Sequence, residues 1–338
     1  MRLRLRRALS FLRDHPRLLV TGQLVVLAIF FGSVGWALRG SFHDAGDDLR
    51  NADPVYFVLA CVALAAYYLV FVLGWMRILA DWNIHLSYPA ALRAEMVSML
   101  AKYVPGGIWT PAARVIAARR AGVTDAALVT VSMLVEAGIS AVAGVIVFVI
   151  SLAWVRGVDA PIAPLVAFAV VVAVLLHPRV FCPIASRVLK KFGYRALPPL
   201  RTSTMALLLL FYCGTWLVGG TALYLLLRSV GAHPALTSIV FLGGTAAVGA
   251  IVAVLFVIAP SGLGVREASM YGLMLAIVAP GAALGATVLN RVAITLVEVL
   301  LLVIGGLLLR GAGQDQASAL FTASRQPATS ADTSRSGS

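Results

Sequence analysis

Five ionisable side chains fall inside long apolar stretches of the chain, where a charge is costly. They are Glu136, Arg266, Glu267, Arg291 and Glu298. A charge at the centre of a bilayer costs about 2.5–3.5 kcal/mol on insertion scales, and such residues often mark a substrate or ion path. We therefore interpret these five as candidates for binding a charged group. The alternative is that they pair with one another and only hold helices together.

Two further cations flank a short stretch rich in proline and glycine. Lys102 precedes this stretch and Arg114 follows it. They could hold an anionic head group through charge-assisted hydrogen bonds, the arginine as a planar fork and the lysine as a point charge. The alternative is that both extend to the cytoplasmic interface. Trp109 follows the same stretch and is either an interfacial anchor or a wall of a cavity.

The chain contains two proline–glycine breaks with related sequences. The first begins at Pro105 and Gly106, and the second contains Pro260, Gly262 and Gly264. Both share the pattern P-x-G-aliphatic, and each lies between two apolar spans. Proline ends a helix and glycine allows a sharp turn, and paired breaks of this kind indicate a transporter's midplane site. We predict two re-entrant hairpins; the alternatives are two kinked helices or simple loops.

A buried charge follows each break at the same distance. Glu136 lies 31 residues after Pro105, and Arg291 lies 31 residues after Pro260. The span before the first break is predicted to enter from outside, and the span before the second from inside. The segments 55–153 and 205–309 are therefore predicted to form an inverted repeat. We expect Glu136 and Arg291 to pair across its axis.

Composition excludes several classes of protein. Of 338 residues, 61% are hydrophobic and 12% are charged, and the mean hydropathy is +0.95. Soluble globular chains are about 45–50% apolar and about 25% charged. A water-soluble enzyme, a disordered chain and a nucleic-acid-binding domain are excluded. The net charge of +13 is more typical of basic cytoplasmic loops than of a nucleic-acid partner.

The apolar runs predict the elements that must position these side chains. A helix needs about 20 apolar residues to cross a bilayer. We predict an all-α polytopic membrane protein with about six full transmembrane helices plus the two re-entrant hairpins. The full spans are predicted at residues 18–38, 55–79, 126–152, 162–176, 205–227 and 282–309.

The distribution of basic residues predicts the orientation. The loop 177–204 holds six basic residues and no acid, which places it in the cytoplasm by the positive-inside rule. Both termini are then predicted to lie in the cytoplasm, and the protein is predicted to reside in the cell (cytoplasmic) membrane. Residues 1–17 are predicted to form a basic arm, residues 18–310 the transmembrane domain, and residues 311–338 a disordered tail.

Motifs for catalysis and cofactors are missing. The five histidines do not have metal-ligand spacing, and there is no nucleotide-binding loop or nucleophile–base arrangement. We therefore expect no enzyme activity, no metal and no cofactor. Any transport would be driven by a gradient, by downhill exchange or by a partner.

Both breaks resemble signatures of the flippase-like membrane region of lysylphosphatidylglycerol synthases and its stand-alone relatives. Residues 102–109, KYVPGGIW, are similar to the first signature, and residues 260–267, PSGLGVRE, are similar to the second, P-x-G-x-G-x-x-E. Glu136 and Arg291 match the family's later acid and arginine. The resemblance covers about residues 15–310. It implies lipid handling, and argues against aminoacyl-lipid synthesis because only residues 311–338 follow.

Two functions remain. The first is a lipid or lipid-linked-precursor transporter that binds an anionic head group, such as that of a phospholipid or polyprenyl-phosphate sugar. This head group would meet Lys102, Arg114, Arg266 and Arg291. The second is a non-transporting scaffold that docks a cell-envelope glycosyltransferase or lipid-modifying enzyme on loop 177–204. An enzyme acting on lipids is the least supported interpretation.

Overall fold

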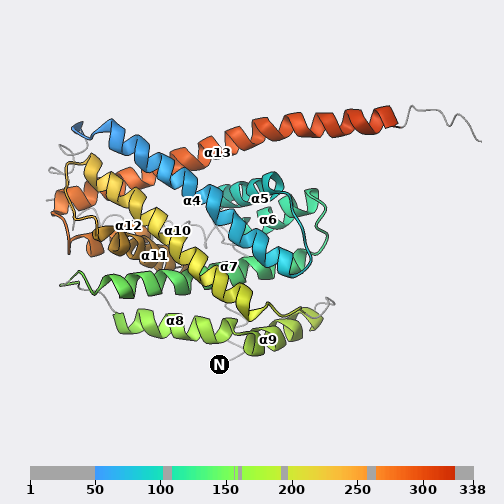
Figure 1. Ribbon diagram of the computed structural model, residues 1–338, viewed down its shortest axis with the longest axis horizontal. Helices are drawn as coiled ribbons and strands as arrows, with labels where there is room; N and C mark the ends of the chain where they lie inside the picture. Colours follow the sequence, from blue (N-terminus) through green and yellow to red (C-terminus); the bar gives the residue numbers. More distant parts are fainter. Residues whose placement is uncertain are drawn as a thin grey trace, which may run out of the picture.

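The computed structural model describes residues 50–101, 109–155, 157–158, 162–191, 197–256 and 264–323, with side chains as far as Ile304. All elements of regular secondary structure in the described residues are helices (Figure 1). Its helices are α4 (Pro54–Asp81), α5 (Tyr88–Ala101), α6 (Trp109–Arg120), α7 (Ala126–Ser151), α8 (Ile162–Leu176), α9 (Pro178–Lys191), α10 (Thr202–Ser229), α11 (Ser238–Leu255), α12 (Val265–Met274) and α13 (Pro280–Ala323).

Several of these helices are suited to cross a membrane. In the described part of the chain, five are long and apolar enough: α4, α7, α10, α11 and α13 as far as Ile304. The pair α8 and α9 forms a sixth if it is counted as one bent span. An all-α polytopic membrane protein is thus confirmed. The span predicted at 18–38 lies outside the described residues. Helix α11 was predicted as one half of a re-entrant hairpin, but it is long and apolar enough to cross the membrane by itself.

Local sequence explains where the long helices begin. Asp53 caps α4 by accepting a hydrogen bond from the backbone N–H of Val55 at 2.8 Å, and Pro54 occupies the first helical position, where no backbone N–H is needed. Asp125 caps α7 in the same way.

Helix α13 continues to Ala323, beyond the end predicted at 309. The segment 311–323 is rich in alanine and glutamine, which extend a helix at little cost.

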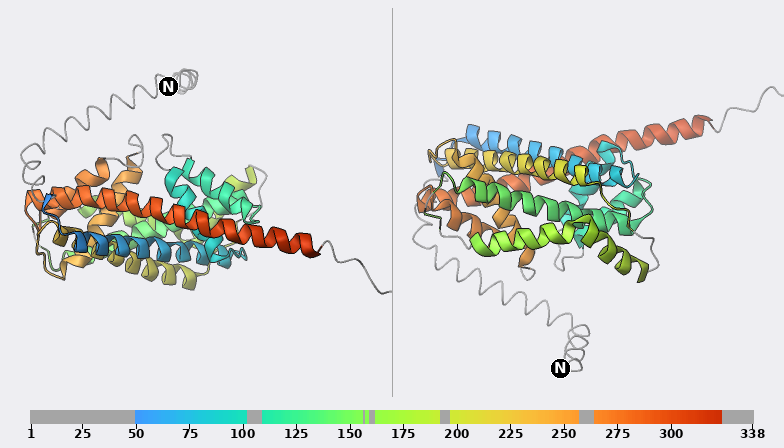
Figure 2. Two further views of the ribbon diagram at one scale, coloured as in Figure 1. Left: turned by 90° about the horizontal axis from the view of Figure 1, so that it is seen from above. Right: turned by 60° about the horizontal axis from the view of Figure 1, so that its bottom comes forward.

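The antiparallel helices α4 and α10 pack on each other over most of their length and lie side by side along one face of the bundle (Figures 1 and 2). At one end, the backbone N–H of Asp53 donates to the carbonyl of Ser229 at 2.8 Å. At the other end, the backbone N–H of Arg201 donates to Asp81 Oδ2 at 2.9 Å. Aromatic rings fill the space between the two helices, among them Tyr67, Phe71, Tyr212 and Trp216.

In the chain, α4 and α10 are each followed by a pair of shorter helices that pack on each other. Helix α5 packs on α6, and α11 packs on α12. Leu86 before α5 and Val123 after α6 join one cluster with Leu79 near the end of α4. Residues 230–234 before α11 and 277–282 after α12 line one cavity of about 520 Å³ at the end of α10. The two helical pairs therefore begin and end at opposite ends of the bundle.

The packing of α4–α7 matches that of α10–α13. Helix α7 packs on α10 and α11, and correspondingly α13 packs on α4 and α5. Helices α6 and α12 pack on α7 and α13 respectively. If α4, α5, α6 and α7 are replaced by α10, α11, α12 and α13 respectively, and the reverse, the same pairs of helices remain in contact. Helices α8 and α9 lie outside this arrangement, along one flank of α7 (Figure 2).

Candidate functional site

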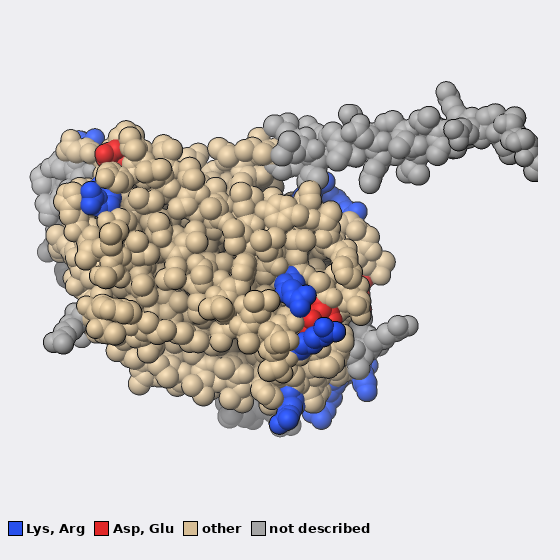
Figure 3. Space-filling model, viewed as in Figure 1, with Lys and Arg blue, Asp and Glu red and all other residues tan. Residues whose placement is uncertain are grey.

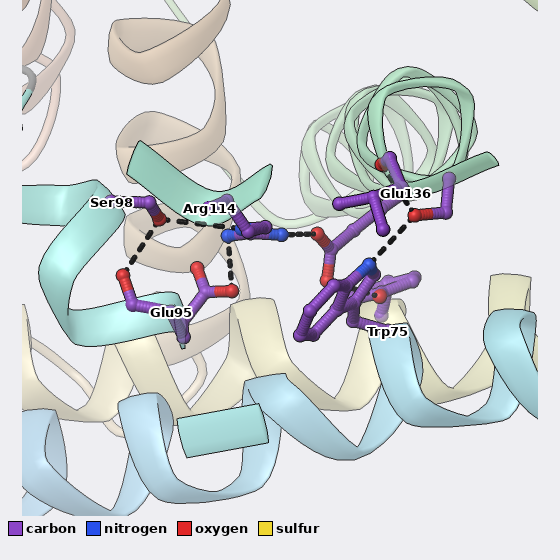
Figure 4. Close-up of polar contacts among 8 residues, drawn as sticks. Trp75, Glu95, Ser98, Arg114 and Glu136 are labelled. Atoms are coloured by element: carbon purple, nitrogen blue, oxygen red, sulfur yellow. Dashed lines mark hydrogen bonds and ion pairs between the residues drawn. The ribbon is translucent and has the colours of Figure 1, made fainter. Parts of the chain in front are cut away.

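A buried ion-pair network joins α5, α6 and α7 (Figure 4). Arg114 Nη1 donates to Glu136 Oε2 at 2.6 Å, and its Nη2 forms an ion pair with the carboxylate of Glu95. Arg114 Nε donates to Ser98 Oγ at 3.3 Å. All four residues are buried. One guanidinium therefore contacts two carboxylates, an arrangement in which its planar fork directs a donor to each.

Residues of α4 and α10 complete this network. The ring of Trp75 in α4 lies under the guanidinium, with 4.9 Å between the Arg114 guanidinium carbon and the ring centroid, a cation–π distance. Trp75 Nε1 donates to Ser132 Oγ at 2.8 Å. The Tyr212 hydroxyl in α10 donates to Glu136 Oε1 at 3.2 Å. These contacts fix the positions of α5 and α6 relative to α4, α7 and α10.

A second charged cluster lies in the other half, where α12 begins beside α13. Arg291 Nη1 lies 3.4 Å from Glu267 Oε1, and Glu267 Oε2 accepts a hydrogen bond from the backbone N–H of Gly264 at 2.7 Å. Gly264 has a φ of 81°, a conformation that glycine adopts far more readily than other residues. Gly264 thus caps the N-terminus of α12, whose first turn contains Glu267.

Arg266 and two tyrosines of α4 extend the second cluster. Arg266 Nε is buried without a hydrogen-bond partner among the described residues. Arg266 lies close enough to Tyr67 and Tyr68 to interact with them electrostatically. The Tyr68 hydroxyl donates to Glu298 Oε1 at 2.6 Å, and both residues are buried. The second half therefore holds two arginines and two carboxylates, and Tyr68 of α4, in the first half, donates a hydrogen bond to one of these carboxylates.

The expected pair of Glu136 with Arg291 is not formed. Glu136 contacts Arg114, and Arg291 contacts Glu267. The reason is that α7 and α13 each pack on the short helix of their own half, which brings a partner within reach. The polarity of the two pairs is opposite: the long helix supplies the acid in the first half and the base in the second.

The remaining predicted site residues are distributed as follows. Trp109 is the first residue of α6 and is 47% exposed. Lys102, Pro105, Gly106, Pro260 and Gly262 lie outside the described residues. Glu95, by contrast, was not predicted as a site residue. The available signal was an acid in an interrupted apolar segment that also carries Arg114, because intramembrane charges tend to pair.

Within the described ranges, no group of three or more His, Cys, Asp or Glu side chains is arranged to hold a metal ion.

Comparison with known proteins identifies the family. A search of curated proteins finds no match. A family model described as the lysylphosphatidylglycerol synthase TM region matches residues 23–305, which is most of the chain. The protein therefore belongs to the family of the lysylphosphatidylglycerol synthase transmembrane region, and is a multi-pass membrane protein of lipid-related function.

Proposed function

We propose that this protein moves an amphiphilic lipid, or a lipid-linked precursor, with an anionic head group across the cytoplasmic membrane. One observation carries the proposal. In the second half, the cations Arg266 and Arg291 accompany Glu267 at the start of α12, and all three side chains are only partly buried. Partly buried arginines inside a membrane domain suit recognition of a phosphate group, which a guanidinium binds in a bidentate manner.

The two ion pairs differ in solvent exposure, and this difference supports different roles for them. The side chains of Arg291 and Glu267 are 21% and 23% exposed, whereas those of Arg114 and Glu136 are 6% and 5% exposed. Arg114 would have to leave two carboxylates to meet a ligand. We therefore assign head-group binding to the second cluster and a positioning role to the Arg114 network.

Two neighbouring features support an amphiphilic ligand. The N-terminus of α12 lies at the second cluster, and the partial positive charge of a helix N-terminus favours an anion. An apolar groove of about 390 Å³ lies nearby, between α4, α7, α8, α10 and α11. Tyr67, which interacts with Arg266, also lines this groove. The groove suits the hydrocarbon chain of a lipid whose head group lies at the cluster.

We further propose that the two halves form an inverted repeat whose axis passes between α4 and α10. The matching neighbours of α4–α7 and α10–α13 support this, as does the antiparallel arrangement of α4 and α10. The two short helical pairs enter from opposite ends of the bundle. Such repeats can rock against each other and expose a central site alternately to the two sides of a membrane.

Charge distribution supports a cytoplasmic position for the end where α4 stops and α10 begins. Lysine and arginine side chains gather at this end (Figure 3). They include Arg77, Arg119, Arg120, Arg187, Lys190 and Lys191. The positive-inside rule assigns such an end to the cytoplasm.

A reconstituted lipid-movement assay tests the proposal. Purified protein is placed in liposomes with fluorescent phospholipid and polyprenyl-phosphate probes, and the inward fraction is followed by chemical quenching. We expect Arg291→Gln and Glu267→Gln to slow movement at least tenfold, about 1.4 kcal/mol of lost stabilisation. Arg119→Gln, an exposed change in α6, should leave it unchanged. Folded wild-type protein that moves no probe would contradict transport and favour the scaffold function.

A further inference from the structure

Helix α9 has an unusual combination of surfaces for a helix of this domain. It follows the apolar helix α8 after a bend of 68°, and none of its 14 residues is buried. It contains no acid, and its four basic residues are all exposed. These are Arg179, Arg187, Lys190 and Lys191.

Five apolar residues of α9 form two strips along the helix. Phe181, Ala185 and Leu189 are half-buried against the core of the bundle. Ile184 and Val188, one turn apart, are 48% and 53% exposed. They lie between the core-facing residues and the basic side of the helix, since successive residues are separated by about 100° around an α-helix. A membrane interface accounts for an exposed aliphatic strip beside a basic strip.

The direction of α9 agrees with a position in the membrane plane. Helix α8 exposes an aliphatic surface that includes Val170, Val171 and Val174, as expected of a helix in contact with lipid chains. Because α9 turns 68° from α8, it runs closer to the plane of the membrane than to its normal. Figure 2 shows this turn at the edge of the bundle.

We propose that α9 is an interfacial helix that binds anionic phospholipid head groups. Ile184 and Val188 insert at the boundary of the hydrocarbon, and the four basic side chains of α9 contact phosphate groups. Charge complementarity selects this partner, because four cations and no acid lie on the exposed part of one helix. Each basic residue near a surface that carries anionic lipid contributes about fivefold in binding. Such lipids are typical of the cytoplasmic leaflet, in agreement with the proposed orientation.

Contact quenching on the full-length protein tests the position of α9. Cys61, Cys182 and Cys213 are replaced by alanine, and a fluorophore is attached to Val188→Cys or to Val254→Cys. The second position, 78% exposed on α11, reports a site facing lipid chains. In phosphatidylcholine liposomes with one-third phosphatidylglycerol, we expect quenching of the label at 188 by acyl-chain-brominated lipid and shielding from aqueous iodide. A label at 188 that iodide quenches freely and brominated lipid does not would overturn the proposal and assign this strip to a protein partner.

The same label tests recognition of the head group. Head-group-labelled phosphatidylglycerol should quench it more strongly than head-group-labelled phosphatidylcholine, and 1 M salt should remove the difference, because the Debye length is then about 3 Å. Replacing the four basic residues of α9 by glutamine should abolish the preference, whereas Arg119→Gln with Arg120→Gln, also exposed, should retain it. A preference that survives the fourfold change would overturn the assignment. The readout is equilibrium contact, so it stands whether or not the protein moves lipid.

Discussion

Arg114 Nη1 in α6 lies 2.6 Å from Glu136 Oε2 in α7, and the two side chains are 22 residues apart in the chain. Both are buried. The same guanidinium also contacts Glu95 in α5. Three helices of the first half are therefore held by one cation, and removing that cation should have a larger effect than removing either acid.

We predict that Arg114→Met lowers the free energy of unfolding by about 3–5 kcal/mol, because breaking a buried ion pair leaves buried charge without its partner. Unfolding of the purified protein by denaturant in detergent micelles measures this change. Glu136→Gln should cost less, because Arg114 still contacts Glu95 and the amide oxygen can still accept from Tyr212. Arg119→Met, an exposed change on the same helix, should stay within about 0.5 kcal/mol. A cost below 1 kcal/mol for Arg114→Met would contradict a structural role for the network.

Sequence patterns predicted several of the spans, because a helix that crosses the hydrocarbon core must be both long and apolar. The predicted spans at 55–79 and 126–152 lie within two residues of α4 (Pro54–Asp81) and within one residue of α7 (Ala126–Ser151). Every backbone polar group in a bilayer core must be satisfied within the helix, so length and hydropathy are nearly sufficient. The end of α13 was missed, because a polar sequence rich in alanine forms a helix without an apolar signal.

The partners of the charged residues could not be predicted in the same way. Equal offsets from the two breaks suggested a pair between Glu136 and Arg291, but an offset fixes only depth along a helix. Which side chains meet depends on helix rotation and on the packing of α6 and α12, neither of which is encoded in spacing alone. Tyr68 illustrates this, because spacing along the chain does not reveal its hydrogen bond to Glu298.

A double-mutant cycle should distinguish the two possible pairings of Arg291. Glu267→Gln and Arg291→Gln are expected to show a coupling energy of about 0.2–1 kcal/mol in unfolding, as measured for partly exposed ion pairs. Glu136→Gln and Arg291→Gln should instead add to within about 0.5 kcal/mol, because these residues do not form a pair. Both cycles can be measured by the same denaturant titration. A coupling energy above 1 kcal/mol between Glu136 and Arg291 would restore the pairing expected from the sequence.

The hydrogen bond between Tyr68 and Glu298 gives a third prediction. Tyr68→Phe removes the donor to a carboxylate that is 2% exposed, so we expect a loss of about 1–3 kcal/mol in the free energy of unfolding. The matched control is Tyr67→Phe, for which no hydroxyl hydrogen bond is found among the described residues. It should change stability by about 0.5 kcal/mol or less. Equal effects of the two changes would show that the hydroxyl of Tyr68 contributes nothing beyond its ring.

The contact between α10 and α11 depends on glycine and gives the fourth prediction. A Cβ atom at Gly220 would lie 2.5 Å from the backbone N of Gly243 and 2.8 Å from its Cα. Backbone cannot move aside as a side chain can, so Gly220→Ala must separate the two helices. We expect a loss of about 1–3 kcal/mol, measured as a lower unfolding midpoint in detergent. Gly214→Ala in the same helix meets nothing within 4 Å and should instead stabilise the protein slightly, because alanine favours a helix by about 1 kcal/mol over glycine. Stabilisation by both changes would mean that α10 and α11 are not in close contact.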